Sequence, residues 1–175
     1  MKYYIDKQHS DIEFKIKHLM ISSVRGRFCS FEAGMSSYKK DFSDAQIWCH
    51  IKVDSIDTAV SDRDAHLKSQ DFFDVEKYPL MKFHSTEIRQ KGSNEYVLEG
   101  LMEIKGVEKP VCLNLTYNGS DFDNTGREKF GFEIEGKIKR SDWNLDFNMP
   151  GGKSTLLIGE EVILDISIQM VRDEE

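Results

Sequence analysis

Residues of the types that perform chemistry are present in this chain, but they are scattered. Asp62 and Asp64 flank Arg63, and paired carboxylates can act as a general acid and base. Such acids are also typical of an exposed helix start, where the helix dipole favours them. The sequence contains no GxSxG, HExxH, P-loop or GxGxxG motif. A metal site needs converging ligands, so we predict no catalytic and no metal site from the dispersed histidines His9, His18, His50, His66 and His84.

The cysteines and the opening residues bear on the compartment. Cys29, Cys49 and Cys112 form no CxxC pair, and a sparse, odd set is typical of buried or half-buried free thiols in a reducing compartment. The first residues show no basic segment followed by an apolar one, as a signal peptide would. We therefore expect a cytoplasmic location.

Composition excludes several partners. The 175 residues carry a net charge of −7 without a basic run, whereas nucleic acids and anionic membrane surfaces attract clustered Lys and Arg. No apolar stretch approaches the roughly 20 residues of a membrane-spanning helix. The hydrophobic fraction of 39% and the eleven Phe residues are typical of a folded protein. We expect one domain over residues 1–175, without nucleic-acid binding or membrane insertion.

Alternation of apolar and polar residues dominates the sequence. It is typical of antiparallel strands with one buried and one wet face. Six runs show it cleanly: 12–18, 45–53, 96–104, 111–117, 130–138 and 162–170. In two further runs, 24–35 and 80–88, the alternation slips, as a β-bulge would cause.

These eight long runs predict an all-β fold, an eight-stranded antiparallel β-barrel, because closure removes exposed strand edges. The segment 61–69 breaks the alternation and begins with residue types that cap helices. We predict one short helix there, with Ser61 or Asp62 as its N-cap. The loop 146–155 is long, and long loops are often functional.

The sequence leaves the content of the barrel open. An eight-stranded barrel is either filled by side chains or holds one small ligand. The inward faces carry mainly Ile, Leu, Val, Phe and Met, with Gly26, Ala45, Gly100 and Gly136 among them. Small residues leave room either for large neighbours or for a ligand.

Four spaced motifs resemble those of a known family. The first is DKQHSDIEFKIKH at 6–18, continued by VRGRF at 24–28; the others are RDAHLKSQDFFD at 63–74, GLMEIKGVEKPV at 100–111 and RSDW at 140–143. The motifs are spread over nearly the whole chain and are similar to those of the YceI-like family, also called the polyisoprenoid-binding lipocalin-like family. The chain has Trp143-Asn144 where that family commonly has Phe-Gly.

The resemblance implies a lipocalin-like barrel that holds a long isoprenoid or acyl lipid in an apolar tunnel, without catalysis and without a cofactor other than a co-purified lipid. The expected tunnel residues are Ile16, His18, Phe28, Ile47, Phe72, Phe83, Leu98, Met102, Leu113, Phe132 and Leu164. At the mouth, the candidates for contact with a quinone or pyrophosphate head are Arg63, His66 and Arg140. Relatives are often dimers, and Trp48 with His50 forms an outward aromatic spot, so we expect a homodimer.

Two other classes of function stay open. An enzyme could act on a small apolar substrate inside the barrel, although the inward faces carry no clustered acid–base pair. A stress-response protein could have a filled barrel and bind a protein partner on its surface. Extraction of the purified protein with organic solvent separates these classes, because only a carrier retains stoichiometric lipid.

Overall fold

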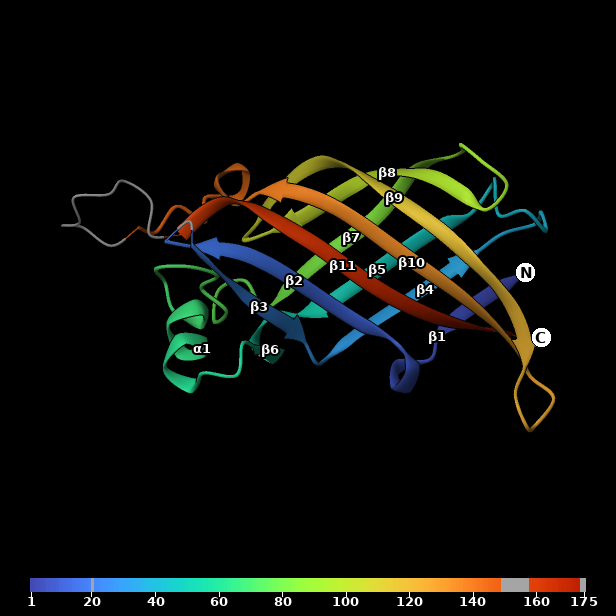
Figure 1. Ribbon diagram of the computed structural model, residues 1–175, viewed down its shortest axis with the longest axis horizontal. Coiled ribbons are helices and arrows are strands. Elements are labelled where there is room, and N and C mark those ends of the chain that lie inside the picture. The colour runs from blue at the N-terminus through green and yellow to red at the C-terminus, as the bar shows by residue number, and fades with distance from the viewer. Residues whose placement is uncertain (20, 149–157, 174–175) are drawn as a thin grey trace.

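The computed structural model of the protein describes residues 1–19, 21–148 and 158–173, and its strands form one antiparallel sheet that closes into a barrel (Figure 1). The strands are β1 (Lys2–Ile5), β2 (Asp11–His18), β3 (Ser22–Phe28), β4 (Phe31–Ser36), β5 (Gln46–Lys52), β6 (Ile56–Asp57), β7 (Leu80–Gln90), β8 (Glu95–Ile104), β9 (Val107–Phe122), β10 (Glu128–Lys139) and β11 (Ile158–Arg172). Short helical elements are η1 (Lys7–His9), η2 (Val53–Ser55), α1 (Ser61–Lys68) and η3 (Arg140–Trp143).

The barrel consists of eight long strands, three of which are broken into two pieces. The short helix η1 separates β1 from β2, residues 29–30 separate β3 from β4, and η2 separates β5 from β6. The order around the ring is β1-β4-β5-β7-β8-β9-β10-β11, and β11 pairs with β1 to close it. The other half of β11 pairs with β2, which continues the sheet through β3 to β6. The predicted eight-stranded antiparallel barrel with one short helix is confirmed.

The two predicted bulges have different outcomes. In the run 24–35 the strand ends at Phe28 and restarts at Phe31, so the prediction of a bulge was wrong there. Backbone N–H groups of Cys29 and Ser30 donate to the carbonyl (3.1 Å) and the hydroxyl (3.0 Å) of Ser55. These bonds satisfy amides that leave the ladder, which lets the sheet turn a corner.

The slip in the run 80–88 is a true bulge. The register between β7 and β8 shifts between Ser85 and Glu87. The hydroxyl of Ser85 accepts a hydrogen bond from the N–H of Ile47 at 2.8 Å. The bulge therefore also fixes β7 against β5, and this prediction is confirmed.

Helix α1 lies at one end of the barrel, and both termini lie at the opposite end (Figure 1). Its bounds, Ser61–Lys68, agree with the predicted helix, but the predicted cap was wrong: Val60 is the N-cap and provides no side-chain hydrogen bond. The carboxylate of Asp64 instead accepts from the N–H (2.9 Å) and the hydroxyl of Thr58. This contact ties the first turn of α1 to the segment that follows β6.

Aromatic side chains fill the barrel end near the termini. The loop 37–45, between β4 and β5, places Phe42 inside the barrel, where it is 2% exposed. Its ring centroid lies 5.1 to 5.9 Å from those of Tyr3, Tyr117, Phe130 and Phe132. We call these five residues the aromatic plug. The hydroxyl of Tyr96 donates to the carbonyl of Asp41 at 2.6 Å and anchors the loop.

Candidate functional site

The barrel end beside α1 contains a cavity of about 420 Å³, within the roughly 300–1,000 Å³ of small-molecule sites. Its wall is mainly apolar. The strands contribute Phe14, Ile16, Lys17, His18, Val24, Phe28, Ile104, Ile138, Ile158, Val162 and Leu164. The segments around α1 and η3 contribute Thr58, Asp62, Arg63, His66, Leu67, Phe72, Phe73, Arg140, Trp143, Leu145 and Phe147. Most of the long loop 146–155 lies outside the described residues.

The cavity occupies only part of the barrel's length. Along β11, Ile158, Val162 and Leu164 line it, whereas Ile168 and Met170, farther along the same face, are buried in the core. The strands that enclose the cavity therefore continue past it into a packed interior, which ends in the aromatic plug.

The predicted tunnel residues divide into two groups. Those that line the cavity are Ile16, His18, Phe28, Phe72 and Leu164. Those that belong to the packed core or press against it are Ile47, Phe83, Leu98, Met102, Leu113 and Phe132. The second group does not border this cavity, because neighbouring side chains fill the barrel at its level. A role in ligand binding stays a prediction for all eleven.

The three predicted mouth residues all line the cavity, and each also makes polar contacts within the protein. The guanidinium of Arg63 donates to the hydroxyl (2.7 Å) and carbonyl (2.6 Å) of Thr58. Nε2 of His66 lies 2.9 Å from the carboxylate of Asp71, and its ring meets that of Phe72 edge-on. Both side chains are therefore held in place at the wall.

Arg140 is buried, with 5% of its surface exposed. Its guanidinium donates to the backbone carbonyls of Gly159 (2.9 Å), Phe147 (3.1 Å), Ile158 (3.3 Å) and Leu145. These carbonyls replace the water that a buried cation loses. Arg140 thereby fastens the segment after η3 to the start of β11, which makes it a positioning residue of the cavity wall.

Glu160 supports the same wall. The N–H of Ser141 donates to its carboxylate at 2.9 Å, and the hydroxyl of Ser141 donates to the same oxygen. These hydrogen bonds, together with the positive charges of Arg140 and Lys139, hold the pKa of Glu160 below its usual value. The ionised carboxylate thus holds η3 against β11 at neutral pH.

Sequence reasoning missed part of the wall. Alternation places several missed residues on faces already predicted to point inward: Phe14, Ile104, Ile138 and Val162. Trp143, Leu145 and Phe147 come from η3 and the irregular segment after it, which have no periodic signal. Trp143 is 1% exposed, and its Nε1 donates to the carbonyl of Met102 at 3.0 Å. Met102 lies far from Trp143 in the sequence, so no local pattern reveals this hydrogen bond.

The inward glycines make room for large neighbours. A Cβ atom added to Gly26 would lie 2.3 Å from the ring of Phe14, and one added to Gly136 would lie 2.3 Å from Cδ2 of Leu113. At Gly100 it would lie 2.4 Å from a neighbouring ring and 2.5 Å from a backbone carbonyl. The space above these three glycines is therefore already filled, and the cavity lies elsewhere in the barrel.

The cysteines are all free thiols. Cys49 is half-buried, and desolvation raises the pKa of its thiol to about 12, which suppresses the reactive thiolate. Cys29 and Cys112 are exposed, so the expectation of burial was wrong for them. Across the described residues, no three His, Cys, Asp or Glu side chains converge as metal ligands would.

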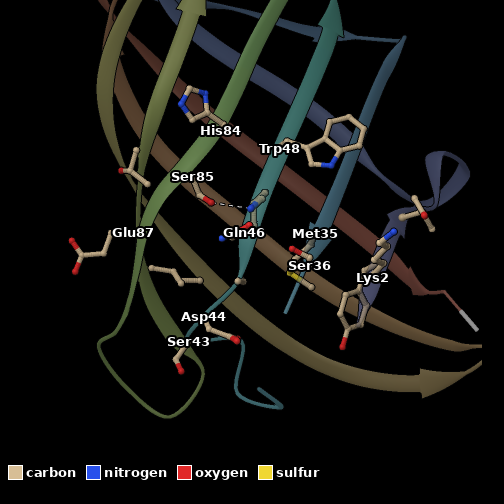
Figure 2. Close-up of a pocket in the computed structure, with 16 residues that line it drawn as sticks. Lys2, Met35, Ser36, Ser43, Asp44, Gln46, Trp48, His84, Ser85 and Glu87 are labelled. Atoms are coloured by element: carbon tan, nitrogen blue, oxygen red, sulfur yellow. Dashed lines mark hydrogen bonds between the residues drawn. The ribbon is translucent and has the colours of Figure 1, made fainter. Parts of the chain in front are cut away.

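A groove of about 910 Å³ lies along β1, β4, β5 and β7 (Figure 2). Trp48 is 39% exposed, its ring centroid lies 5.1 Å from that of His50, and it is paired in register with His84 on β7. Charged residues such as Lys2 and Glu87 also line this groove. The expected aromatic spot thus faces outward, while the homodimer stays a prediction.

Comparison with known proteins assigns this barrel to a family. A family model described as YceI-like domain matches residues 3–170. The chain belongs to the YceI-like family. A UPF0312 protein of Photorhabdus laumondii subsp. laumondii is 39% identical to this YceI-like chain over 173 residues, which cover 99% of the chain and 86% of the relative.

Solved structures share the YceI-like barrel. A Campylobacter jejuni YCEI protein is 33% identical, with a TM-score of 0.78 and coverage of 97% of both chains. A polyisoprenoid binding domain from Saccharophagus degradans is 13% identical, with a TM-score of 0.74 over 98% of both chains, which shows the fold alone. Within the described residues, the structure has no helix with the length and apolar character that a bilayer crossing requires.

Proposed function

We propose that this YceI-like protein binds one amphiphilic lipid, of isoprenoid quinone, polyprenyl or fatty-acyl type, and carries it without catalysis. The observation behind this proposal is the cavity of about 420 Å³ with a mainly apolar wall. Each methylene of the tail that becomes buried contributes about 0.8 kcal/mol to binding. An apolar tail needs no directional hydrogen bonds from the cavity wall. The Saccharophagus degradans neighbour, a polyisoprenoid binding domain, supports the proposal.

The polar head of the ligand belongs at the edge of the cavity where polar side chains gather. Lys17 and His18 end β2, and Asp62 begins α1 at the same end of the barrel (Figure 1). Lys17 and Asp62 are exposed. A head group placed here keeps its contact with water while the tail is buried.

The two alternative classes have less support. An enzyme needs a general acid and a general base at its substrate, yet two of the three mouth residues, Arg63 and Arg140, are guanidinium groups bound to Thr58 and to backbone carbonyls, and His66 is the one imidazole among them. A completely filled barrel with a protein partner leaves the cavity unexplained. A binding protein accounts for both features.

Lipid extraction tests the proposed function. Protein purified without added lipid is extracted with organic solvent, and we expect mass spectrometry to find about one lipid per chain. Leu164→Trp fills the cavity and should remove most of this lipid. Ile163→Trp is the matched control, because the adjacent residue faces the other side of β11 and should retain it. A parent protein that carries no lipid and binds none when it is added would contradict the proposal.

The dimer and the location need their own tests. Trp48 and His50 offer an exposed aromatic contact on β5, and we propose that two copies meet there. Sedimentation equilibrium should give the dimer mass for the parent and the monomer mass for Trp48→Ala; a monomeric parent would contradict the dimer. A cytoplasmic location remains a proposal that cell fractionation tests.

A further inference from the structure

We infer that residues 60–73, which include α1, form a lid that opens to let the lipid in and out, and that Phe147 is the seat on which this lid closes. This inference rests on the proposed function, because it gives the route to the same cavity. Its basis is an uneven distribution of contacts around the cavity: hydrogen bonds hold the strands and η3 in place, whereas aromatic rings connect the lid to the segment after η3.

The strands that enclose the cavity do not separate easily. β2 is paired with β3 on one side and with β11 on the other, and β11 is paired with β10 along most of its length. A tail that passed between two of these strands would leave several backbone N–H and C=O groups without partners, which is costly away from water. The tail must therefore pass through the end of the barrel, where α1 lies (Figure 1).

The seat is fixed to the barrel. Arg140 donates hydrogen bonds to the carbonyl of Phe147 at 3.1 Å and to that of Gly159, at the start of β11, at 2.9 Å. Nε1 of Trp143 donates to the carbonyl of Met102 on β8 at 3.0 Å. Movement of the seat would break these buried hydrogen bonds, so the seat stays in place when the mouth opens.

The lid is a compact unit with its own hydrogen bonds. The N–H of Phe73 donates to the carbonyl of Leu67 at 3.0 Å, and Nε2 of His66 lies 2.9 Å from the carboxylate of Asp71. No residue of α1 itself is buried. Within the described part of the chain, no hydrogen bond or ion pair joins residues 60–73 to residues 140–148. The lid can therefore leave the seat without losing a polar contact.

The first turn of α1 provides the pivot. Arg63 donates to the hydroxyl of Thr58 at 2.7 Å, and the carboxylate of Asp64 accepts from the N–H of Thr58 at 2.9 Å. Ala59 connects Thr58 to the lid with a φ of 63°, a conformation that non-glycine residues seldom adopt. Hinges are a few residues that absorb changes in backbone angles, so we place the hinge at Ala59.

Three aromatic rings close the lid on the seat. The ring centroid of Phe147 lies 4.7 Å from that of His66 and 5.1 Å from that of Phe72, and the two lid rings are 5.1 Å apart. All three residues line the cavity. Aromatic contacts are individually weak, and the partner of His66, Asp71, belongs to the lid and moves with it. This contact is therefore the part of the cavity wall that opens at the lowest cost.

A reversible cross-link between lid and seat tests the inference. His66→Cys and Phe147→Cys are combined with Cys29→Ser and Cys112→Ser, which remove the exposed thiols, and a bifunctional methanethiosulfonate reagent joins the two new cysteines. Stopped-flow fluorescence then measures uptake and release of a fluorescent fatty acid. We expect the cross-link to slow both rates at least tenfold, and dithiothreitol to restore them.

Glu133→Cys with Ser167→Cys, in the same serine background, is the matched control. These two exposed residues are paired in register on β10 and β11, which already share a hydrogen-bonded ladder. The same cross-link there should change neither rate by more than about twofold, because it leaves the lid free to move.

Phe147→Leu tests the seat without a cross-link. The variant keeps an apolar side chain at the cavity but loses both ring contacts to the lid. We expect uptake and release to become faster by similar factors, about fivefold each, so that the dissociation constant stays within about twofold of the parent's. A residue that only contacts the bound tail would change release and leave uptake as it was.

The outcomes separate the lid from the function. Cross-linked protein that takes up and releases the fatty acid as fast as the reduced protein would overturn the lid and leave the proposed function intact. The lid would also be wrong if the control cross-link slowed exchange equally, or if Phe147→Leu changed release alone. A parent protein that binds no fluorescent fatty acid at equilibrium would instead contradict the proposed function.

Discussion

At the end of the barrel near the termini, Phe42 packs among four other aromatic rings, whereas at the α1 end the same sheet surrounds a cavity. Both ends are enclosed by inward faces of the same apolar character. The difference arises from the segments that close them. The loop 37–45 turns a large ring into the barrel, while α1 and η3 lie at the wall and leave the interior open.

The comparison shows that strand alternation decides what faces inward and that the closing segments decide what fills the space. Phe42 has a φ of 57°, a conformation that non-glycine residues seldom adopt. Its loop is held by Asp44, whose carboxylate accepts from the hydroxyl of Ser37 at 2.6 Å. The filled end should therefore contribute more to the free energy of unfolding, and the end with the cavity should bind the ligand.

The largest expected effect follows from emptying the aromatic plug. Phe42→Ala removes four ring contacts from a buried site, and we expect it to lower the free energy of unfolding by about 3–5 kcal/mol. Phe73→Ala, at the half-buried cavity wall, should cost clearly less stability but weaken lipid binding. Urea unfolding and lipid titration measure the two effects. Equal stability losses for the two variants would break the distinction between the ends.

Substitutions that add bulk should also distinguish the packed interior from the cavity: they should destabilise the packed interior and leave stability at the cavity nearly unchanged. Gly100→Leu meets the ring of Phe83 and the backbone carbonyl of His84, which cannot move aside, so we expect a loss of about 3 kcal/mol or more. Ile138→Phe extends into the cavity and should change the melting temperature little while it lowers lipid affinity. Thermal unfolding with and without lipid measures both. A large destabilisation by Ile138→Phe would mean that its site is packed rather than open.

The smallest expected effect is a loss of stability at acidic pH. Lys129 lies 2.8 Å from Asp6 and 3.6 Å from Asp123 near the filled end, and its hydrogen bond lowers the pKa of Asp6 below the usual 3.8. A carboxyl group with a lower pKa in the folded state stabilises the fold above its unfolded pKa, and this contribution is lost as the pH falls through the folded pKa. Stability should therefore fall below about pH 4.

Asp6→Asn tests this dependence. The variant should be slightly less stable than the parent at neutral pH and should lose less stability below about pH 4. Asp165→Asn, on the outer face of β11, serves as the control and should follow the parent. Unfolding in urea across a pH series gives the slopes, and an acid slope of Asp6→Asn equal to that of the parent would refute the assignment.

The sequence was sufficient to predict the barrel fold. It was not sufficient to predict which parts of the interior are packed with side chains and which part is a cavity. Period-two alternation identifies strands and inward faces because it is a local property of each strand. The corner at Cys29 depends on hydrogen bonds to Ser55, and Arg140 depends on carbonyls contributed by other segments, so both are invisible locally. Leu98 and Leu164 have equivalent patterns, yet one is in the core and the other lines the cavity. What lies across the barrel from each residue makes that difference.

The central claim is that a lipid tail enters the α1 end and leaves the filled end untouched. Methyl-resolved NMR of isoleucine and leucine side chains, during titration with farnesol, tests it most directly. We predict chemical-shift changes at Ile16, Ile138 and Leu164, with the methyl signals of Leu115 and Ile168 nearly unchanged. Changes centred on Leu115 and Ile168, or no changes in any of these signals at saturating farnesol, would contradict the account.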